Sequence, residues 1–550
     1  MIALLAAAWA QDPIVTALQE ELQRSMSELV LPDSPRPYFV AYRMKEAWNI
    51  EVRASLGGVL RDTVGPDRRL VAEVRVGSPE YDSVNFRSGY GSENGLVATD
   101  LVIGDAPLAV RKDAWLGSDA AYKEGVANLS AKEAADARRS EGDTTPDYTL
   151  GEPLEHLGQK GAAPDLARLR ELAVAISARF AKHPDVELSS VTAWASGGRF
   201  VVIDSLGMHV ERPIESVDLE ISGNARAADG SRTSDLRSIR VRTLDDLPSL
   251  AELERSVDDI ARALTSWQAA TIPEEPYIGP LLVEGSAAVD LFRRRILTEL
   301  QGTPDPERPV SGTRRISFGS SGSPERAYAL KRRILPRGWT ITDDPQSDPR
   351  SPAWRTHDDE GTPTQAIELV TDGIVRTHYM SRTPSSAIAQ SNGHGRSDRD
   401  YTVRGSPMVT ELHPDRTATR RRLHKEALKI TATYGNDHYL VLRRYESDIP
   451  DLFRMRVPGH EPLELVRVFA NGREEHIRGV ELEGLTRRAL RDAVMAGDST
   501  TEVFRSGSDH FQITAPSVLL DEVEAKPRHG SAEKPPPVAS PLAREPSTGR

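Results

Sequence analysis

The chain has 550 residues and a formal net charge of −12, with 38% hydrophobic and 28% charged residues. At roughly 150 residues per domain this length predicts two or more domains, and the composition is that of a folded globular protein. The negative charge argues against a nucleic-acid binder, and the absence of cysteine excludes disulfides, a cysteine nucleophile and thiolate zinc ligands. No run of about 18 apolar residues occurs, so no membrane span is predicted.

The first ten residues, MIALLAAAWA, are uncharged and apolar and end in an A-x-A pattern. That pattern is typical of a signal-peptide cleavage site, but the basic segment that normally precedes it is missing. Two interpretations stay open: residues 1–10 are the remnant of a signal peptide, or they are the first turn of a helix. The first predicts a periplasmic or secreted protein, with a cytoplasmic protein as the alternative.

Residues 11–272 alternate between helical and strand-like patterns, which predicts an α/β region. Apolar residues recur at helical spacing over 12–30, and Asp165 is placed to cap another helix. Residues 189–224 read as strands, with a turn at Ser205-Leu206-Gly207. The segment of about 140–163 is rich in Gly, Pro, Asp and Thr without periodicity, so it is predicted to be a loop or linker.

Beyond a joint near 272–278, residues 275–526 consist mainly of short strand-like runs and predict a β-rich C-terminal domain. Helices are expected only over 286–300 and about 417–432. Asp372-Gly373 and Asn471-Gly472 each separate two such runs, which predicts type I′ hairpins. Residues 527–550 are rich in Pro, Lys, Glu and Ser and are predicted to be disordered. The predicted fold class is therefore α+β.

The sequence shows no motif that marks a catalytic centre. The chain has 13 histidines but no HExxH, and His460-Glu461 is followed by a proline that breaks the helix this motif needs. No dinucleotide-binding or phosphate-loop glycine pattern and no G-x-S-x-G elbow is evident. From the residues alone, the chain is a soluble α+β protein with no visible catalytic centre.

Several C-terminal strings nevertheless resemble the TldD/PmbA family, whose PmbA branch is also called TldE. They are YIGPLLVEGSAAVDLF (277–292), DDEGTPTQAIELVTDGIVRTHYMSRTPSSA (358–387), SNGHGR (391–396) and ITAPSVLLDEVE (513–524). The resemblance covers about residues 36–525. It implies an α/β N-terminal domain, a largely β C-terminal domain and a metallopeptidase built from paired subunits.

In the TldD type, the resemblance implies two zinc-binding histidines in an HExxxH helix and a later cysteine, with the motif glutamate as general base. Here Val283 and Ala288 stand in the histidine places, only Glu284 matches, and no cysteine exists. The chain therefore resembles the PmbA type, with no metal of its own. Zinc is expected only in a partner, a second family member carrying HExxxH.

Glu284 is the one catalytic candidate, and its structural alternative is a carboxylate near a helix N-terminus. The candidate peptide-binding residues are Ser391, Asn392, Gly393, His394, Gly395, Arg396 and Glu360. Two glycines allow the 391–396 loop to lie against an extended peptide. For the acidic run Asp358-Asp359-Glu360, a solvated turn is the favoured interpretation over peptide contact.

Three functions remain open at this point. The first is the metal-free subunit of a paired metallopeptidase that acts on unfolded peptides. The second is an active metallopeptidase with unorthodox ligands, for which His357, His394 and His413 would have to converge. The third is a non-enzymatic binding or scaffold protein. None involves nucleic acid.

Overall fold

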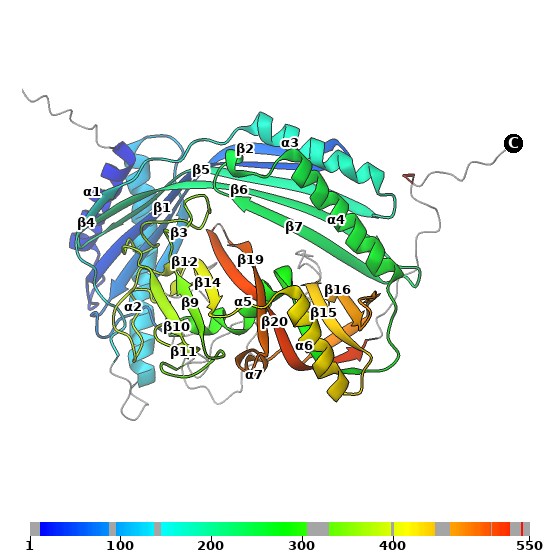
Figure 1. Ribbon diagram of the computed structural model, residues 1–550. Helices are drawn as coiled ribbons and strands as arrows, with labels where there is room; N and C mark the ends of the chain where they lie inside the picture. Colours follow the sequence, from blue (N-terminus) through cyan, green and yellow to red (C-terminus); the bar gives the residue numbers. More distant parts are fainter. Residues whose placement is uncertain are drawn as a thin grey trace, which may run out of the picture.

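A computed structural model of the chain describes residues 12–86, 95–136, 145–304, 329–397, 401–445, 462–507, 509–528 and 541–542. Two large sheets dominate it, and Figure 1 shows the long strands of the first sheet arching over the second half of the chain. Separate sheets with helices packed against them make an α+β fold, which confirms the predicted fold class.

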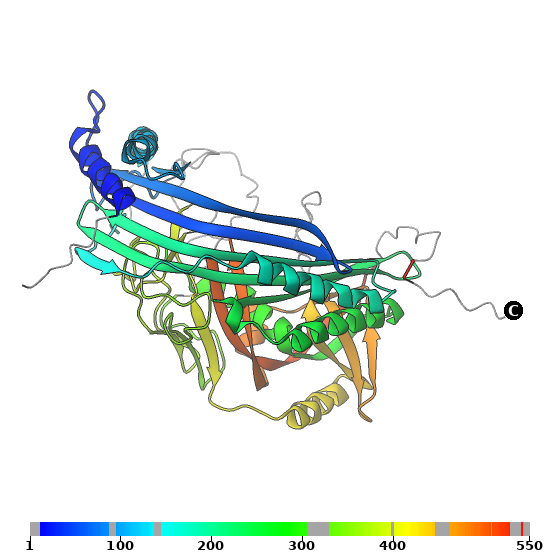
Figure 2. The ribbon, with the colours of Figure 1, turned by 90° about the horizontal axis from the view of Figure 1, so that it is seen from above.

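Within the described residues, the first sheet has seven strands: β1 (Pro37–Ser55), β2 (Gly58–Val76), β3 (Leu96–Asp100), β4 (Leu154–Leu157), β5 (Leu188–Asp204), β6 (Met208–Arg226) and β7 (Arg232–Val241). Their order is β3-β2-β1-β5-β6-β4, and β7 also pairs with β6. From above, Figure 2 shows the four longest strands running side by side along the molecule. Leu56 and Gly57 join β1 to β2, and both have the positive φ that a tight two-residue hairpin needs.

Residues of alternate parity give this sheet one apolar and one charged face. On β1, Tyr42 and Ile50 belong to clusters under the helices, whereas Arg43 and Lys45 point the opposite way. Helices α1 (Pro13–Glu28) and α2 (Pro107–Asp136) cover one part of the apolar face, and α3 (Leu166–Ala178) and α4 (Leu250–Ala269) cover the other. The charged face therefore meets the second half of the chain.

Local sequence sets where these helices begin. The Asp12 carboxylate accepts hydrogen bonds from the first amides of α1, and Asp165 accepts one from the Arg168 amide at the start of α3, as predicted. Ser249 and Glu252 form a capping box at α4. Such caps satisfy amides that have no partner inside the helix.

In the described part of the second half, eleven strands form one sheet: β8 (Tyr277–Val283), β9 (Trp339–Asp343), β10 (Ile367–Thr371), β11 (Ile374–Val375), β14 (Val409–Pro414), β15 (His438–Tyr445), β16 (Pro462–Phe469), β17 (Glu474–Ile477), β18 (Val480–Glu483), β19 (Met495–Ser506) and β20 (Asp509–Pro527). The order is β11-β10-β9-β14-β20-β8-β15-β16-β17, with β18 and β19 also paired to β20. Two short strands, β12 (Gly395–Ser397) and β13 (Val403–Gly405), pair separately.

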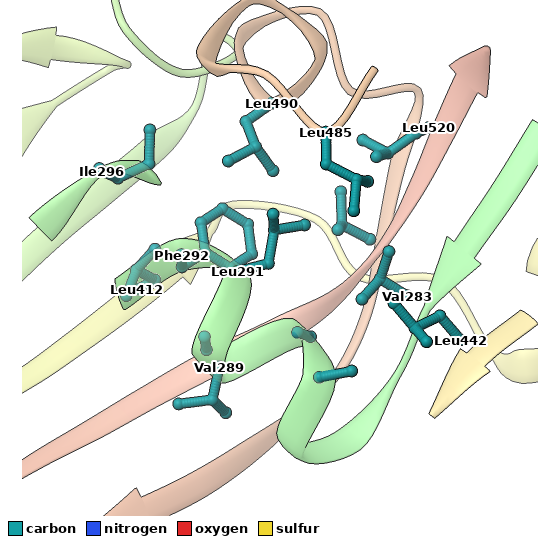
Figure 3. Packing of buried hydrophobic residues seen from close by; sticks show 14 of the residues in the cluster. Val283, Val289, Leu291, Phe292, Ile296, Leu412, Leu442, Leu485, Leu490 and Leu520 are labelled. Atoms are coloured by element: carbon teal, nitrogen blue, oxygen red, sulfur yellow. The ribbon is translucent and has the colours of Figure 1, made fainter. Parts of the chain in front are cut away.

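Both faces of this sheet are covered at its centre, where β8 lies. Leu281 and Val283 belong to the large cluster around α5 (Gly285–Arg295), and Leu282 belongs to the cluster under α6 (Arg420–Thr433). Figure 3 shows Phe292 and its neighbours filling the first cluster. The shorter helices are α7 (Arg487–Arg491) and the 3₁₀ turns η1 (Arg179–Lys182), η2 (Leu244–Asp246) and η3 (Leu297–Leu300).

Three local predictions can be compared directly with these elements. Asp372 and Gly373 both have positive φ, which confirms a type I′ turn between β10 and β11. Asn471-Gly472 joins β16 to β17, but only Gly472 has positive φ, so the hairpin is confirmed and the turn type is wrong. The linker prediction at 140–163 is wrong over 154–157, where β4 adds to β6 in parallel.

Three further predictions concern segments at the joint and the ends. The predicted joint near 272–278 falls between the end of α4 at Ala269 and the start of β8 at Tyr277. The signal-peptide prediction at 1–10 lies outside the described residues, as does most of the tail predicted at 527–550. None of the described helices combines the length and apolarity that a membrane span requires.

Candidate functional site

Glu284 lies at the junction of β8 and α5, where its backbone N–H donates to the Leu442 carbonyl. Its side chain makes no capping hydrogen bond to the helix. Instead the carboxylate accepts from the Arg443 guanidinium at 3.3 Å, and Arg420 lies 3.7 Å away. Arg443 also holds Glu474, so Glu284 is one carboxylate of an ion-pair cluster that joins α5 to β15 and β17.

Val283, just before Glu284, and Ala288, four residues after it, are part of the hydrophobic core. Val283 and Ala288 are both 0% exposed and belong to the same buried cluster. Figure 3 shows the Val283 side chain beside Leu442. A ligand at these two positions would therefore have to lie inside the core.

The 391–396 loop is packed into the protein. Asn392 accepts from the Met380 amide and donates to the His378 carbonyl, while the fully buried His394 imidazole contacts Asp343 at 3.2 Å. Gly393 has a φ of 72°, and a Cβ there would lie 2.2 Å from the Pro363 carbonyl oxygen. These contacts use the loop to hold neighbouring segments together.

The acidic run 358–360 is also buried, so its interpretation as a solvated turn is wrong. Asp358 accepts hydrogen bonds from the amides of Glu360, Thr362 and Gly395. Burial, together with the neighbouring Glu360 carboxylate, raises the pKa of Asp358 well above its ordinary value. Glu360 accepts from the Arg382 amide at 2.6 Å, and burial raises its pKa as well. The signal that was missed is tertiary, because the Arg212 guanidinium and the amides of Arg382 and Gly395 come from distant segments.

A cavity of about 380 Å³ lies between the charged face of the first sheet and loops of the second half. Its floor is one row of residues across four adjacent strands: Arg69, Lys45, Phe200 and Arg212 are direct cross-strand neighbours on β2, β1, β5 and β6. The opposite wall comes from the 351–359 loop and the β19–β20 hairpin. Sequence analysis did not find this site, although the alternating charges on β1 and β2 are visible in the sequence.

Buried ion pairs lie around this cavity, and one of them connects the two halves of the chain. Arg212 of the first sheet binds Asp359 at 2.5 Å. Arg355 binds Asp509 through both of its terminal nitrogens, and Arg396 approaches the same carboxylate at 3.0 Å. Burial opposes ionisation of Asp509, but Arg355 and Arg396 hold its pKa well below the ordinary value.

Residues 316–436 match the family described as PmbA/TldA metallopeptidase C-terminal domain. The chain thus contains a C-terminal domain of the PmbA/TldA type. No curated protein matches it in sequence.

Three solved structures share the fold over nearly the whole chain. TldE from Thermococcus kodakarensis superposes with a TM-score of 0.59 at 14% identity, covering 92% of this chain and 99% of that one. A candidate modulator of a DNA gyrase from Thermotoga maritima gives 0.57 at 16% identity, covering 89% and 96%. A similarly named protein from Bacteroides thetaiotaomicron gives 0.58 at 12% identity, covering 93% and 98%.

The TldD/PmbA zinc motif can be tested against the residues present. Val283 and Ala288 offer no lone pair and are buried, so these two positions do not fit a zinc ion. The described residues also contain no group of three or more His, Asp or Glu arranged to hold a metal. His394 contacts Asp343 and His413 contacts Glu411, while His357 lies against His156. The proposed convergence of the three histidines thus finds no support.

The contact between His156 of β4 and His357 of the second half is expected to depend on pH. Their ring centroids are 4.4 Å apart, and burial, then the neighbouring His156 and Arg212, lowers the pKa of His357 to about 4. In the unfolded chain this histidine has a pKa of about 6.5, so between pH 6.5 and 4 the unfolded state binds the proton more readily than the folded state. The free energy of unfolding therefore falls as pH falls from 6.5 towards 4. Allowing for solvent screening, we expect the free energy of unfolding to fall by an amount on the order of 1–2 kcal/mol.

The measurement is urea unfolding of the wild type and His357→Gln at pH 7 and at pH 4.5. The difference in free energy of unfolding between the two proteins should narrow or reverse at the lower pH. His413→Gln, which changes an exposed imidazole, is the matched control. A constant difference at both pH values would contradict the assignment.

Proposed function

We propose that this chain is the metal-free subunit of a paired TldD/PmbA-type metallopeptidase that acts on unfolded peptides. The observation that carries the proposal is the burial of Val283 and Ala288 in the hydrophobic core, at the places where the family motif has histidines. The partner would be a second family member whose HExxxH helix holds zinc. The likeness in fold to TldE from Thermococcus kodakarensis supports this branch of the family.

The surroundings of Glu284 support the same proposal. A general base must reach a metal-bound water or a substrate proton within hydrogen-bond distance. The Glu284 carboxylate is instead engaged by Arg443 and approached by Arg420, in a cluster that also contains Glu474. Its proposed role is to fix the start of α5 against β15.

The proposal includes export to the periplasm or beyond, because the apolar MIALLAAAWA segment ends in an A-x-A pattern. A cytoplasmic location is the alternative. Fractionation of the native host, with a full-length chain detected by an antibody, separates the two. An intact N-terminus in the cytoplasmic fraction would contradict export.

Glu284→Gln is expected to leave peptide cleavage by the paired complex within about twofold of the wild type. The physical reason is that the proposed general base lies in the partner, where loss of the motif glutamate costs on the order of 10²–10⁴ in rate. The measurement is co-purification of both chains, followed by cleavage of an unfolded peptide by each chain alone and by the pair. The control is the corresponding Glu→Gln variant of the partner.

Two outcomes would replace the proposal. Chelator-sensitive cleavage by this chain alone, with about one zinc per chain in elemental analysis, would establish an active metallopeptidase with other ligands. A stable complex without any peptide turnover would establish a binding or scaffold protein.

A further inference from the structure

The floor of the interdomain cavity places like charges next to one another. Lys45 on β1 lies directly opposite Arg69 on β2, and Arg212 on β6 is separated from Lys45 only by Phe200. Like charges in direct cross-strand register destabilise a sheet. Arg69 is paired with Asp100 at 3.0 Å and Arg212 with Asp359, so Lys45 is the cation of this row that has no counterion among the described residues.

Hydrogen-bond donors on this floor are incompletely satisfied. Lys45 makes no hydrogen bond or ion pair with any described residue, and burial lowers its pKa although Asp67 and Asp509 oppose that shift. The 3% exposed Arg43 donates to the Tyr401 carbonyl and lies 3.6 Å from the Glu73 carboxylate through one nitrogen, while its Nε and Nη1 have no hydrogen-bond partner. Arg212 Nε is buried without a partner as well. Buried unpaired donors of this kind are costly.

Acidic residues of the cavity are already occupied by other cations. Asp359 is held by Arg212, Asp509 by Arg355, and Glu215 by Arg242 at 2.8 Å. Asp67 is the lining carboxylate that has no ion pair among the described residues. Six Lys or Arg and four Asp or Glu line the cavity. With Glu73 and Asp100, which pair with Arg43 and Arg69, and Arg396, which binds Asp509, the formal excess is one positive charge.

Apolar surface surrounds this small cationic excess. Phe200 and Val71 contribute to the floor, and Trp354 and Pro352 line the wall formed by the second half. The volume of about 380 Å³ lies within the range of roughly 300–1,000 Å³ that is usual for small-ligand sites. A ligand that fits has one localised negative charge and an apolar body.

We propose that this cavity binds the C-terminal carboxylate of a peptide, with the carboxylate on Lys45 and Arg43 and an apolar last side chain against Phe200 and Trp354. The inference rests on the proposed function, which makes peptides the ligands of this chain. A phosphate dianion fits less well, because four carboxylates line the same cavity and would repel a second negative charge. A monoanionic carboxylate matches the surplus.

The test is binding of the peptide Ala-Ala-Phe with a free C-terminus to the full purified chain, compared with the same peptide as its C-terminal amide. Fluorescence anisotropy with an N-terminal dye at low salt measures both. We expect the acid to bind at least tenfold more tightly than the amide. Hydrogen bonds to a charged group of about 1.5–3 kcal/mol correspond to roughly 10–150-fold in affinity.

Lys45→Met should reduce affinity for the acid at least tenfold while leaving thermal stability unchanged or higher, because it removes an unpaired charge. Lys45→Arg should retain most of the binding, and it keeps the test valid if the Met variant fails to fold. Lys182→Met removes one exposed charge on η1, outside the cavity lining. It should leave the affinity for the acid peptide and the thermal stability unchanged.

Equal binding of acid and amide, or full affinity in Lys45→Met, would overturn the inference. So would competition by inorganic phosphate at concentrations where acetate has no effect. The binding assay uses this chain alone, whereas the proposed function is tested by pairing and cleavage. If the paired complex cleaves peptides but this chain does not prefer the free carboxylate, only the inference is refuted. If this chain binds the carboxylate but forms no pair and no cleavage is seen, only the paired role is refuted.

Discussion

Replacing Asp509 by Asn is expected to lower the free energy of unfolding by about 3 kcal/mol. Asp509 is the shared counterion of Arg355 and Arg396, whose side chains are 2% and 5% exposed. Breaking a buried pair from one side leaves an uncompensated buried charge, which typically costs 3–5 kcal/mol. Because Arg355 comes from the 351–359 loop and Asp509 from β20, the variant should also loosen the packing of that loop against β20 within the second half. Urea unfolding at pH 7 measures the loss.

The matched control is Asp245→Asn, which removes the partner of Arg168 from an exposed pair 2.6 Å long. Exposed ion pairs contribute at most about 1 kcal/mol to stability, so Asp245→Asn should lower the free energy of unfolding only slightly. The depressed pKa of Asp509 adds a pH test: the stabilisation is present above the unfolded value of about 3.9 and is lost as pH falls further. The difference between wild type and Asp509→Asn should thus hold at pH 5–7 and shrink below about pH 4. Equal losses in the two variants would refute the buried network.

The double substitution Val283→His with Ala288→His is expected to destabilise the fold by about 4 kcal/mol or more without creating a zinc site. Both positions are fully buried among apolar side chains. Each imidazole adds volume to a packed core and buries polar nitrogens, with typical costs of 1–3 kcal/mol for each effect. The measurement is the melting temperature with and without zinc, together with elemental analysis.

Ser286→His is the control for the histidine side chain, because it lies in the first turn of the same helix and is only partly buried. It should change the free energy of unfolding by no more than about 0.5 kcal/mol. A zinc-dependent rise in the melting temperature of the double variant would reveal a latent metal site. That result would mean the chain has lost only its ligands and not the geometry around them.

Predictions that depend on a few neighbouring residues succeeded. The caps at Asp165 and the turn at Asp372-Gly373 follow from hydrogen bonds and φ preferences inside one segment. The linker prediction failed at β4 because its four residues become a strand only by pairing with β6, some fifty residues later. The type I′ turn predicted at Asn471-Gly472 was wrong, because a hairpin can close through several backbone conformations around one glycine.

The acidic run 358–360 marks the limit of what composition can indicate. Three consecutive carboxylates beside a glycine are typical of a solvated turn. Here they are buried because the Arg212 guanidinium and the backbone amides of Arg382, Gly395 and Ser397 from other segments meet them. No local pattern encodes these partners, since they lie more than a hundred residues away or arrive through the backbone of another loop.

By itself the sequence determined the α+β class, the helix caps and the family strings, and it placed Val283 and Ala288 where metal ligands would be expected. Each of these depends on residue type and short spacing. Only the tertiary structure decided the cavity, because its floor joins strands from residues 43 to 216 and its wall joins loops from 351 to 510. Which charges are paired and which stay free depends on the packing of distant segments, and Lys45 is left without a partner for that reason.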